Sequence, residues 1–123
     1  MKHLFVPYEL AVKLKEKGFD EPVIASYKSE FKNDIYPTKY WSEDNRNSMW
    51  IEGIISAPLY QQVIDWFREK HNLHIEVRRN LDGWAYNIIE FSKGNKCIIS
   101  KPNETEDYYQ ELKTAIEEAL KLI

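Results

Sequence analysis

The stretch that decides the fold is residues 74–91, which read HIEVRRNLDGWAYNIIEF. Two runs rich in β-branched and aromatic residues flank Asp82-Gly83, a dipeptide that favours a two-residue type I′ turn. The pattern therefore predicts a β-hairpin in which Leu81 faces Trp84. Because side chains alternate along a strand, one face of this hairpin is predicted to be core, and it carries Ile75, Val77, Leu81, Trp84, Tyr86 and Ile88.

A third strand is predicted to follow the hairpin. Gly94-Asn95 is a second turn signal, and residues 97–100 come after it with three apolar side chains. In this register Ile89, Phe91 and Ile98 fall on the wetter face of the sheet. We therefore expect either a β-bulge that changes the register or another element that covers this face.

The first of three predicted amphipathic helices spans residues 7–17. Its apolar side chains recur at three- and four-residue intervals, and charged residues fill the other faces. Gly18 follows as the left-handed residue that ends many helices. Phe19 is placed to fold back onto the last turn, as in a Schellman cap.

Two more helices are predicted from the same spacing of apolar side chains. Residues 59–70 form one of them, with Ser56 as the expected N-cap and Asn72 as a left-handed end. The other runs to the end of the chain from Asn103, whose spacing to Glu106 is that of a capping box.

The remaining segments are predicted to be two short strands and a long loop. Residues 22–27 and 50–55 are rich in β-branched side chains, whereas residues 28–49 show no periodicity and include the polar run SEDNRNS at 42–48. A loop of this length in a compact domain is typically functional or mobile. The whole pattern predicts a single α+β domain over residues 1–123, with a small antiparallel sheet, the hairpin plus a third strand, packed by about three helices.

Composition restricts the classes of partner. The chain has 123 residues, of which 43% are apolar and 30% charged, an ordinary globular balance. Its net charge of −3 argues against bulk electrostatic attraction to nucleic acid or anionic membranes. No apolar run suits a signal peptide or a membrane-spanning helix, and a lone cysteine fits a reducing compartment. We therefore expect a cytoplasmic protein with no membrane partner.

No pattern in the chain predicts catalysis or a cofactor. His71 and His74 are three residues apart, but a strand is expected to begin between them and no further ligand has a recognisable spacing. Cys97 lies beside two isoleucines, as a buried and inert thiol would. A small hydrolase or transferase would need a pocket that joins one of these histidines to carboxylates. We expect no cofactor and lean towards a non-enzymatic role.

Aromatic residues make up 14% of the chain, and several of them fall where folding rules explain least. Tyr36, Tyr40, Trp41 and Trp50 lie in or beside the predicted loop, and such rings are frequent anchors of protein interfaces. The alternative is that these rings fold back as a lid over the core. We predict a protein-binding surface here, for another protein or for a second copy of the chain.

Arg78 and Arg79 support a second functional hypothesis, a single-stranded nucleic-acid-binding surface on the hairpin. A sheet that presents arginine beside aromatic rings can stack bases, and Trp84 and Tyr86 lie across the hairpin from this pair. However, the predicted register places both rings on the core face, against a helix. We therefore rank nucleic-acid binding below protein binding.

Three parts of the chain share one family pattern: FVPYELA at residues 5–11, PLYQQVIDWFREK at 58–70, and YYQEL with AIEEAL at 108–112 and 115–120. In these parts the chain resembles a recurrent group of small, uncharacterised proteins encoded in gut Bacteroidetes genomes and their phages or prophages. The resemblance covers most of the chain except the middle loop. It carries no activity, cofactor or catalytic residue, and it implies a mobile-element origin with an accessory role. The resulting hypothesis is a phage-derived accessory protein that acts by protein–protein interaction.

Overall fold

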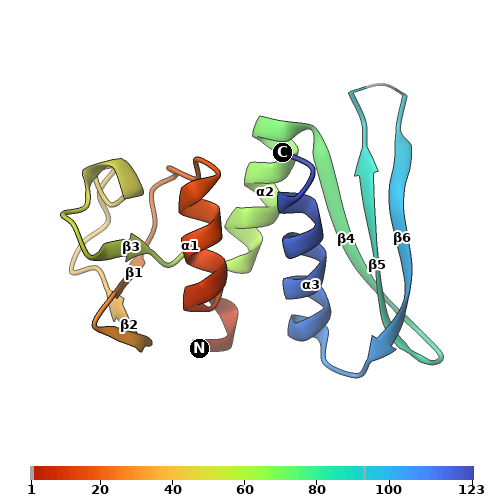
Figure 1. Cartoon of the computed structure of the whole chain (residues 1–123), viewed down its shortest axis with the longest axis horizontal. Helices are drawn as coiled ribbons and strands as arrows, with labels where there is room; N and C mark the ends of the chain where they lie inside the picture. Colours follow the sequence, from red (N-terminus) through yellow and green to blue (C-terminus); the bar gives the residue numbers. More distant parts are fainter. Residues whose placement is uncertain (1, 93) are drawn as a thin grey trace. The chain divides into compact units, whose positions relative to one another are not determined.

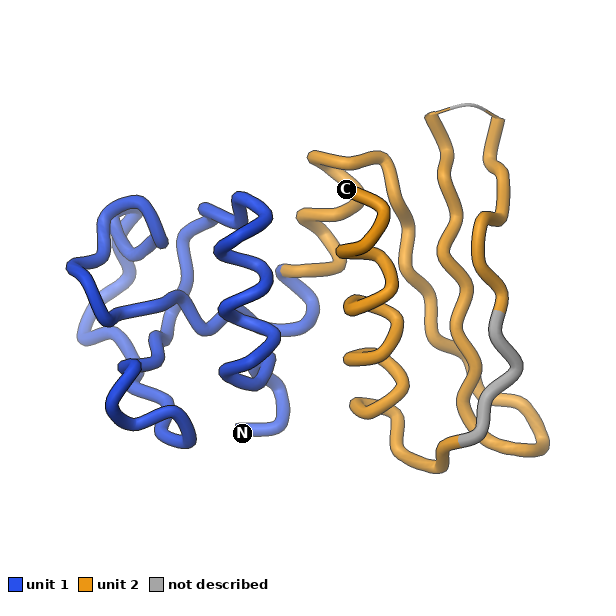
Figure 2. Tube along the Cα trace, in the orientation of Figure 1, with its two compact units in different colours: residues 1–62 blue, residues 63–123 orange. Residues whose placement is uncertain are grey.

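The computed structural model describes residues 2–92 and 94–123, with the side chains of residues 101–104 left out. The chain falls into two compact units, residues 1–62 and residues 63–123 (Figure 2). Each unit holds one three-stranded antiparallel sheet. The predicted α+β class is therefore confirmed, with two sheets where one was expected.

Unit 1, residues 1–62, contains a helix and a small sheet in the strand order β2-β1-β3 (Figure 1). Both β2 and β3 pair with β1 in antiparallel fashion. The elements, in chain order, are the 3-10 turn η1 (Lys2–Leu4), α1 (Tyr8–Glu16), β1 (Ala25–Lys28), β2 (Phe31–Pro37), the 3-10 turn η2 (Asn47–Met49) and β3 (Ile54–Ser56).

Helix α1 ends in the Schellman cap that the sequence predicts. Gly18 takes the left-handed conformation, with φ of 94°. The N–H of Phe19 donates to the carbonyl of Leu14 at 2.9 Å, and that of Gly18 donates to Lys15 at 3.1 Å. Phe19 is buried, so the cap also adds a ring to the core of unit 1.

The strands of unit 1 differ from the prediction in two respects. The strands expected at 22–27 and 50–55 are present with shifted bounds, as β1 and β3. The expected loop over 28–49 contains the unpredicted strand β2, which lies at the sheet edge and is largely exposed. An exposed edge strand has no need for apolar alternation, so the pattern missed it. Ser56, expected to cap the second helix, belongs to β3 and is buried.

Tyr27 on β1 joins the sheet of unit 1 to the segment before α1. Its hydroxyl donates to the backbone carbonyl of Val6 at 2.6 Å, and its ring meets Tyr8 edge-on at a centroid distance of 5.7 Å. Burial, with a smaller contribution from the carboxylate of Glu9, raises the pKa of Tyr27 to about 12. The phenol is therefore a neutral donor at any physiological pH.

Unit 2, residues 63–123, holds a meander in the order β4-β5-β6, with α3 packed on it (Figure 1). The predicted third strand and three helices are therefore confirmed. The unit boundary falls inside α2, which ends as expected at a left-handed Asn72, with φ of 55°. The bounds are α2 (Tyr60–His71), β4 (Leu73–Asn80), β5 (Gly83–Glu90), β6 (Lys96–Thr105) and α3 (Tyr108–Leu120).

The hairpin turn lies one residue earlier than predicted. Asn80 pairs with Gly83, so the two turn residues are Leu81 and Asp82. Neither has a positive φ, which occurs instead at Gly83 (135°), and the type I′ prediction is wrong. The N–H of Asp82 donates to the Asn80 side chain at 3.1 Å, an Asx turn that stabilises this alternative. Leu81, predicted to be core, is 100% exposed because it occupies the turn.

The rest of the predicted core face keeps its orientation, because the observed pairing shifts by an even number of residues. Ile75, Tyr86 and Ile88 are buried, while Val77 and Trp84 are half-buried. Opposite Ile88 and Ile89, the register between β5 and β6 is interrupted. Of the two explanations proposed for the apolar residues on the wetter face, the β-bulge is the one that the structure confirms.

Helix α3 begins later than predicted. It starts at Tyr108, and the side chain of Asp107 caps it by accepting two backbone hydrogen bonds. Asn103 lies within β6 and does not begin the helix. Thr105 still pairs with Trp84 of β5, so the backbone remains extended up to that residue. Because both Asn and Asp are good N-cap residues, local sequence alone could not select between these positions.

Candidate functional site

The aromatic loop, defined here as residues 38–50, carries three of the predicted interaction residues. Tyr40 and Trp41 are 73% and 65% exposed. Trp50 is half-buried, and its indole N–H donates to the hydroxyl of the buried Ser56 at 2.8 Å. The structure therefore separates an exposed pair of rings from a third ring that packs into unit 1.

Polar side chains fasten the aromatic loop to distant parts of unit 1. The amide of Asn47 donates to the carbonyl of Phe19 at 2.8 Å, and its oxygen accepts from the N–H of Ser56 at 2.9 Å. The guanidinium of Arg46 donates to the carbonyl of Asp20 at 3.0 Å. These bonds hold the second half of the loop against both the end of α1 and strand β3.

The backbone around Tyr40 is held as well. The Asn45 side chain donates to the carbonyl of Tyr40 at 2.9 Å, and the Asn45 carbonyl accepts from the N–H of Val23 at 2.8 Å. On the other side of the rings, the N–H of Thr38 donates to the carbonyl of Ile24 at 2.8 Å. The two exposed rings therefore stand on a backbone that is fixed on both sides.

These fastening residues were missed by the sequence analysis. Asn45, Arg46 and Asn47 appeared only as part of the polar run at residues 42–48. The one local signal is the density of asparagine, which is typical of turns. The partners of Arg46 and Asn47 lie far away in sequence, 26 residues for Asp20 and 28 residues for Phe19, so no local pattern could identify them.

Tyr36 lies apart from the aromatic loop, on β2, where it is half-buried. The ammonium of Lys28 lies 4.3 Å from the centre of its ring. Tyr36 also borders an open hollow of about 470 Å³ in unit 1, lined by Lys2, Phe5 and residues 33–37. Among these described lining residues are one lysine and one aspartate but no histidine, serine or cysteine. These lining residues therefore do not form a Ser–His or Cys–His pair.

Arg78 and Arg79 are not brought together. As neighbours on β4 they point to opposite faces of the sheet. The guanidinium of Arg79 lies 5.6 Å from the ring centre of Trp84 and 3.1 Å from the carboxylate of Glu106. Tyr86 is buried, and burial, followed by the charges of two glutamates on α3, raises its pKa. Neither the ring of Trp84 nor that of Tyr86 therefore lies beside an unpaired arginine. Nucleic-acid binding stays a prediction without a supporting contact.

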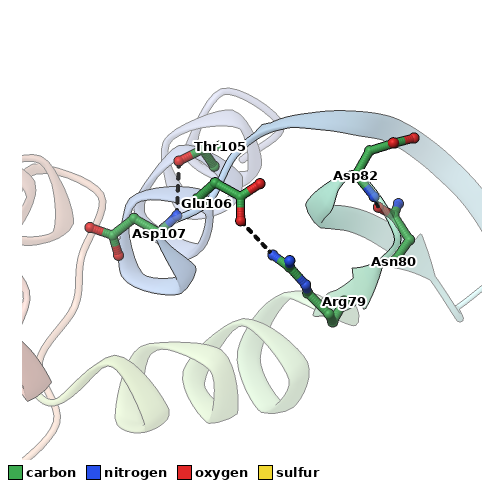
Figure 3. A network of polar contacts seen from close by, with 6 residues as sticks. All are labelled: Arg79, Asn80, Asp82, Thr105, Glu106 and Asp107. Atoms are coloured by element: carbon green, nitrogen blue, oxygen red, sulfur yellow. Dashed lines mark hydrogen bonds and ion pairs between the residues drawn. The ribbon is translucent and has the colours of Figure 1, made fainter.

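Figure 3 shows that the polar groups around Arg79 belong to the junction between the hairpin tip and α3. The hydroxyl of Thr105 accepts from the N–H of Asp107, the residue that caps α3, at 3.1 Å. At the tip, the Asn80 side chain accepts from the N–H of Asp82. These contacts are all between groups of unit 2, so they stabilise its fold.

The residues considered for metal or nucleophilic chemistry do not converge. The His71 ring lies 4.7 Å from Trp66, centre to centre, and burial lowers its pKa. Cys97, predicted to be buried, is exposed because it lies on the edge strand β6 at the bulge. Among the side chains that the structure describes, those of residues 2–92, 94–100 and 105–123, no three His, Cys, Asp or Glu form a metal-binding group. Over the same ranges, no helix has the length and apolar character needed to cross a membrane.

Comparison with known proteins adds no relative to these observations. No family model, no curated protein and no solved structure matches the chain. Function is therefore inferred from the geometry of the residues described above.

Proposed function

We propose that this chain is a non-enzymatic protein-binding module of phage or prophage origin, and that Tyr40 and Trp41 anchor its partner. The observation that carries the proposal is the exposure of two large rings on a backbone held by side-chain hydrogen bonds. Tyrosine and tryptophan dominate the energetic centres of protein interfaces. A loop that is already ordered loses little conformational entropy on binding, which favours affinity.

The distribution of exposed apolar side chains supports the same surface. Among the described residues, unit 1 carries six of the nine large exposed hydrophobic side chains: Ile24, Phe31, Tyr40, Trp41, Met49 and Ile51. Of these, Ile24 is held next to the aromatic loop through its backbone bond with Thr38. Removal of exposed apolar surface from water lowers the free energy of the system. Association through unit 1 is therefore more favourable on this count than association through unit 2.

The proposed phage or prophage origin is inferred from the resemblance of residues 5–11, 58–70 and 108–120 to proteins encoded by phages and prophages. It predicts that the partner is a bacterial or phage protein and that the chain modulates it as an accessory.

Affinity capture from a lysate of the native host tests the proposal. The full chain is immobilised as the wild type, as the double variant Tyr40→Ser/Trp41→Ser, and as the matched control Leu81→Ser. Leu81 is a fully exposed apolar residue in unit 2, so its replacement removes apolar surface away from the aromatic loop. We expect one protein to be recovered equally by the wild type and the control, and about tenfold less by the double variant. Circular dichroism checks that all three are folded.

Equal recovery by the three proteins would contradict the proposal. Recovery that disappears after nuclease treatment would instead favour the nucleic-acid hypothesis through Arg78 and Arg79. Sedimentation of the purified chain alone identifies the case in which the partner is a second copy, because only then does the wild type dimerise while the double variant stays monomeric.

A further inference from the structure

The charge beside the exposed rings indicates what kind of partner they can bind. Directly after Trp41, the N–H of Asn45 donates to the carbonyl of Ser42 at 3.1 Å, which closes a turn with Glu43 and Asp44 at its centre. Both acidic residues are exposed. Neither carboxylate pairs with a cation in the part of the chain that the structure describes.

Arg46, the arginine nearest to this turn in sequence, makes no ion pair with the two carboxylates. The Nε of Arg46 donates to the backbone carbonyl of Glu43 at 2.7 Å, and its Nη1 donates to the carbonyl of Asp20 at 3.0 Å. The guanidinium is therefore committed to backbone oxygens and is half-buried. Lys39 precedes the rings, and the two carboxylates follow them. Within the turn itself, residues 42–45, both charged side chains are acidic and exposed.

The rings of Tyr40 and Trp41 also differ from other rings of the chain in their contacts with cations. Other aromatic rings have a cation of this chain above them, as Tyr36 has Lys28 at 4.3 Å, Tyr8 has Lys32 at 5.5 Å and Trp84 has Arg79 at 5.6 Å. Considering the described residues only, no cation lies above Tyr40 or Trp41. An indole ring attracts cations more strongly than the other aromatic side chains do.

We propose that the aromatic loop binds a segment of its partner that carries lysine or arginine, with the cation placed over Trp41 and near Glu43 and Asp44. This inference rests on the proposed protein-binding function and adds the chemistry of the partner. The electron-rich ring face and the two unpaired carboxylates attract the same charge, and the carboxylates repel the phosphates of a nucleic acid. Ring stacking supplies the apolar contact, and the acidic turn selects a basic partner segment.

A random library of linear dodecapeptides, displayed on filamentous phage, tests the inference on the full chain. Peptides are selected on the wild type and depleted on Tyr40→Ser/Trp41→Ser, so that only peptides that need the rings remain. We expect lysine and arginine to be enriched over the unselected library. We expect a synthetic selected peptide to bind Glu43→Gln/Asp44→Asn about three- to tenfold more weakly than the wild type. Added salt should weaken binding to the wild type more than binding to this variant, because the variant has lost two of the charges that salt screens.

The matched control is Glu16→Gln/Glu69→Gln, which removes two exposed acidic charges outside the loop and should leave the Kd unchanged. Glu43 takes part in the loop through its backbone carbonyl, so replacing its carboxylate preserves the bond to Arg46. Ring-dependent peptides without lysine or arginine, or an unchanged Kd in Glu43→Gln/Asp44→Asn, would overturn the basic partner and leave protein binding intact. A selection that yields no ring-dependent peptide would overturn the proposed function and this inference together.

Discussion

The two units of the chain use arginine, asparagine and aromatic side chains in different ways. In unit 2, Arg79 lies over the ring of Trp84 and pairs with Glu106, so polar and aromatic groups at the surface satisfy one another. In unit 1, the polar Asn47 turns inward onto backbone groups, and Trp41 is left exposed. Side chains of the chain itself therefore cover the ring of Trp84, whereas the ring of Trp41 stays exposed.

The length of the connections explains this difference. The hairpin of unit 2 needs only two turn residues between β4 and β5, because the paired strands satisfy their own backbone groups. In unit 1, residues 38–53 join β2 to β3, and the backbone groups of such a connection need other partners. Asn45, Arg46 and Asn47 supply them. A long loop can thus be ordered by polar side chains while its rings remain outside.

The largest effect is expected from Ile88→Ala in unit 2. Ile88 is fully buried on the central strand β5, and the cavity should lower the free energy of unfolding by about 2–5 kcal/mol, measured by urea denaturation. The control Ile98→Ala, on the exposed edge strand, should cost under about 1 kcal/mol. The sequence predicts a single domain, so amide exchange should accelerate in β1 as well as in β5. Unchanged protection in β1 would show that the two units unfold separately.

A smaller but more local effect is expected from Asn47→Ala in unit 1. The change removes two hydrogen bonds and leaves the Phe19 carbonyl and the Ser56 N–H without this partner, at a cost of about 2–3 kcal/mol. Asn33→Ala, at an exposed position on β2, is the matched control and should change stability by less than about 0.5 kcal/mol. Hydrogen exchange at Ser56 should accelerate only in the first variant. Equal stability of the two variants would mean that the loop is ordered by other contacts.

The smallest effect at neutral pH is expected from Tyr27→Phe, which removes the bond to the Val6 carbonyl at a cost of about 1–2 kcal/mol. This cost should depend on pH. Because the pKa of Tyr27 is about 12 in the folded protein and about 10 in the unfolded chain, only the unfolded state loses the proton between these values. Wild-type stability therefore falls as pH rises through this interval, and the Phe variant lacks this contribution.

Urea denaturation of both proteins at about pH 8 and about pH 11 measures the effect, and the two stabilities should converge at the higher pH. Tyr86, whose pKa is also raised, is present in both proteins, so their difference isolates Tyr27. A difference that stays constant with pH would contradict the buried phenol as its source.

The parts of the fold that depend on neighbouring residues could be predicted. The cap at Gly18 and Phe19 was correct because a Schellman motif involves only the last turn of a helix and the residues that follow it. The even spacing along residues 74–91 placed Ile75 and Ile88 correctly on the core face, even though the turn was misplaced. Errors arose where two local choices were equivalent, as with Asn103 and Asp107 for the start of α3.

The sequence by itself determined the helices, the third strand and the presence of an aromatic segment outside the regular core, because periodicity and capping are properties of short stretches. Only the tertiary structure decided that Trp50 bonds to Ser56 while Tyr40 and Trp41 are exposed. Three rings in one loop have the same local preference for burial. Their different positions depend on hydrogen bonds such as that between Asn47 and Phe19, whose partners are brought together by the fold.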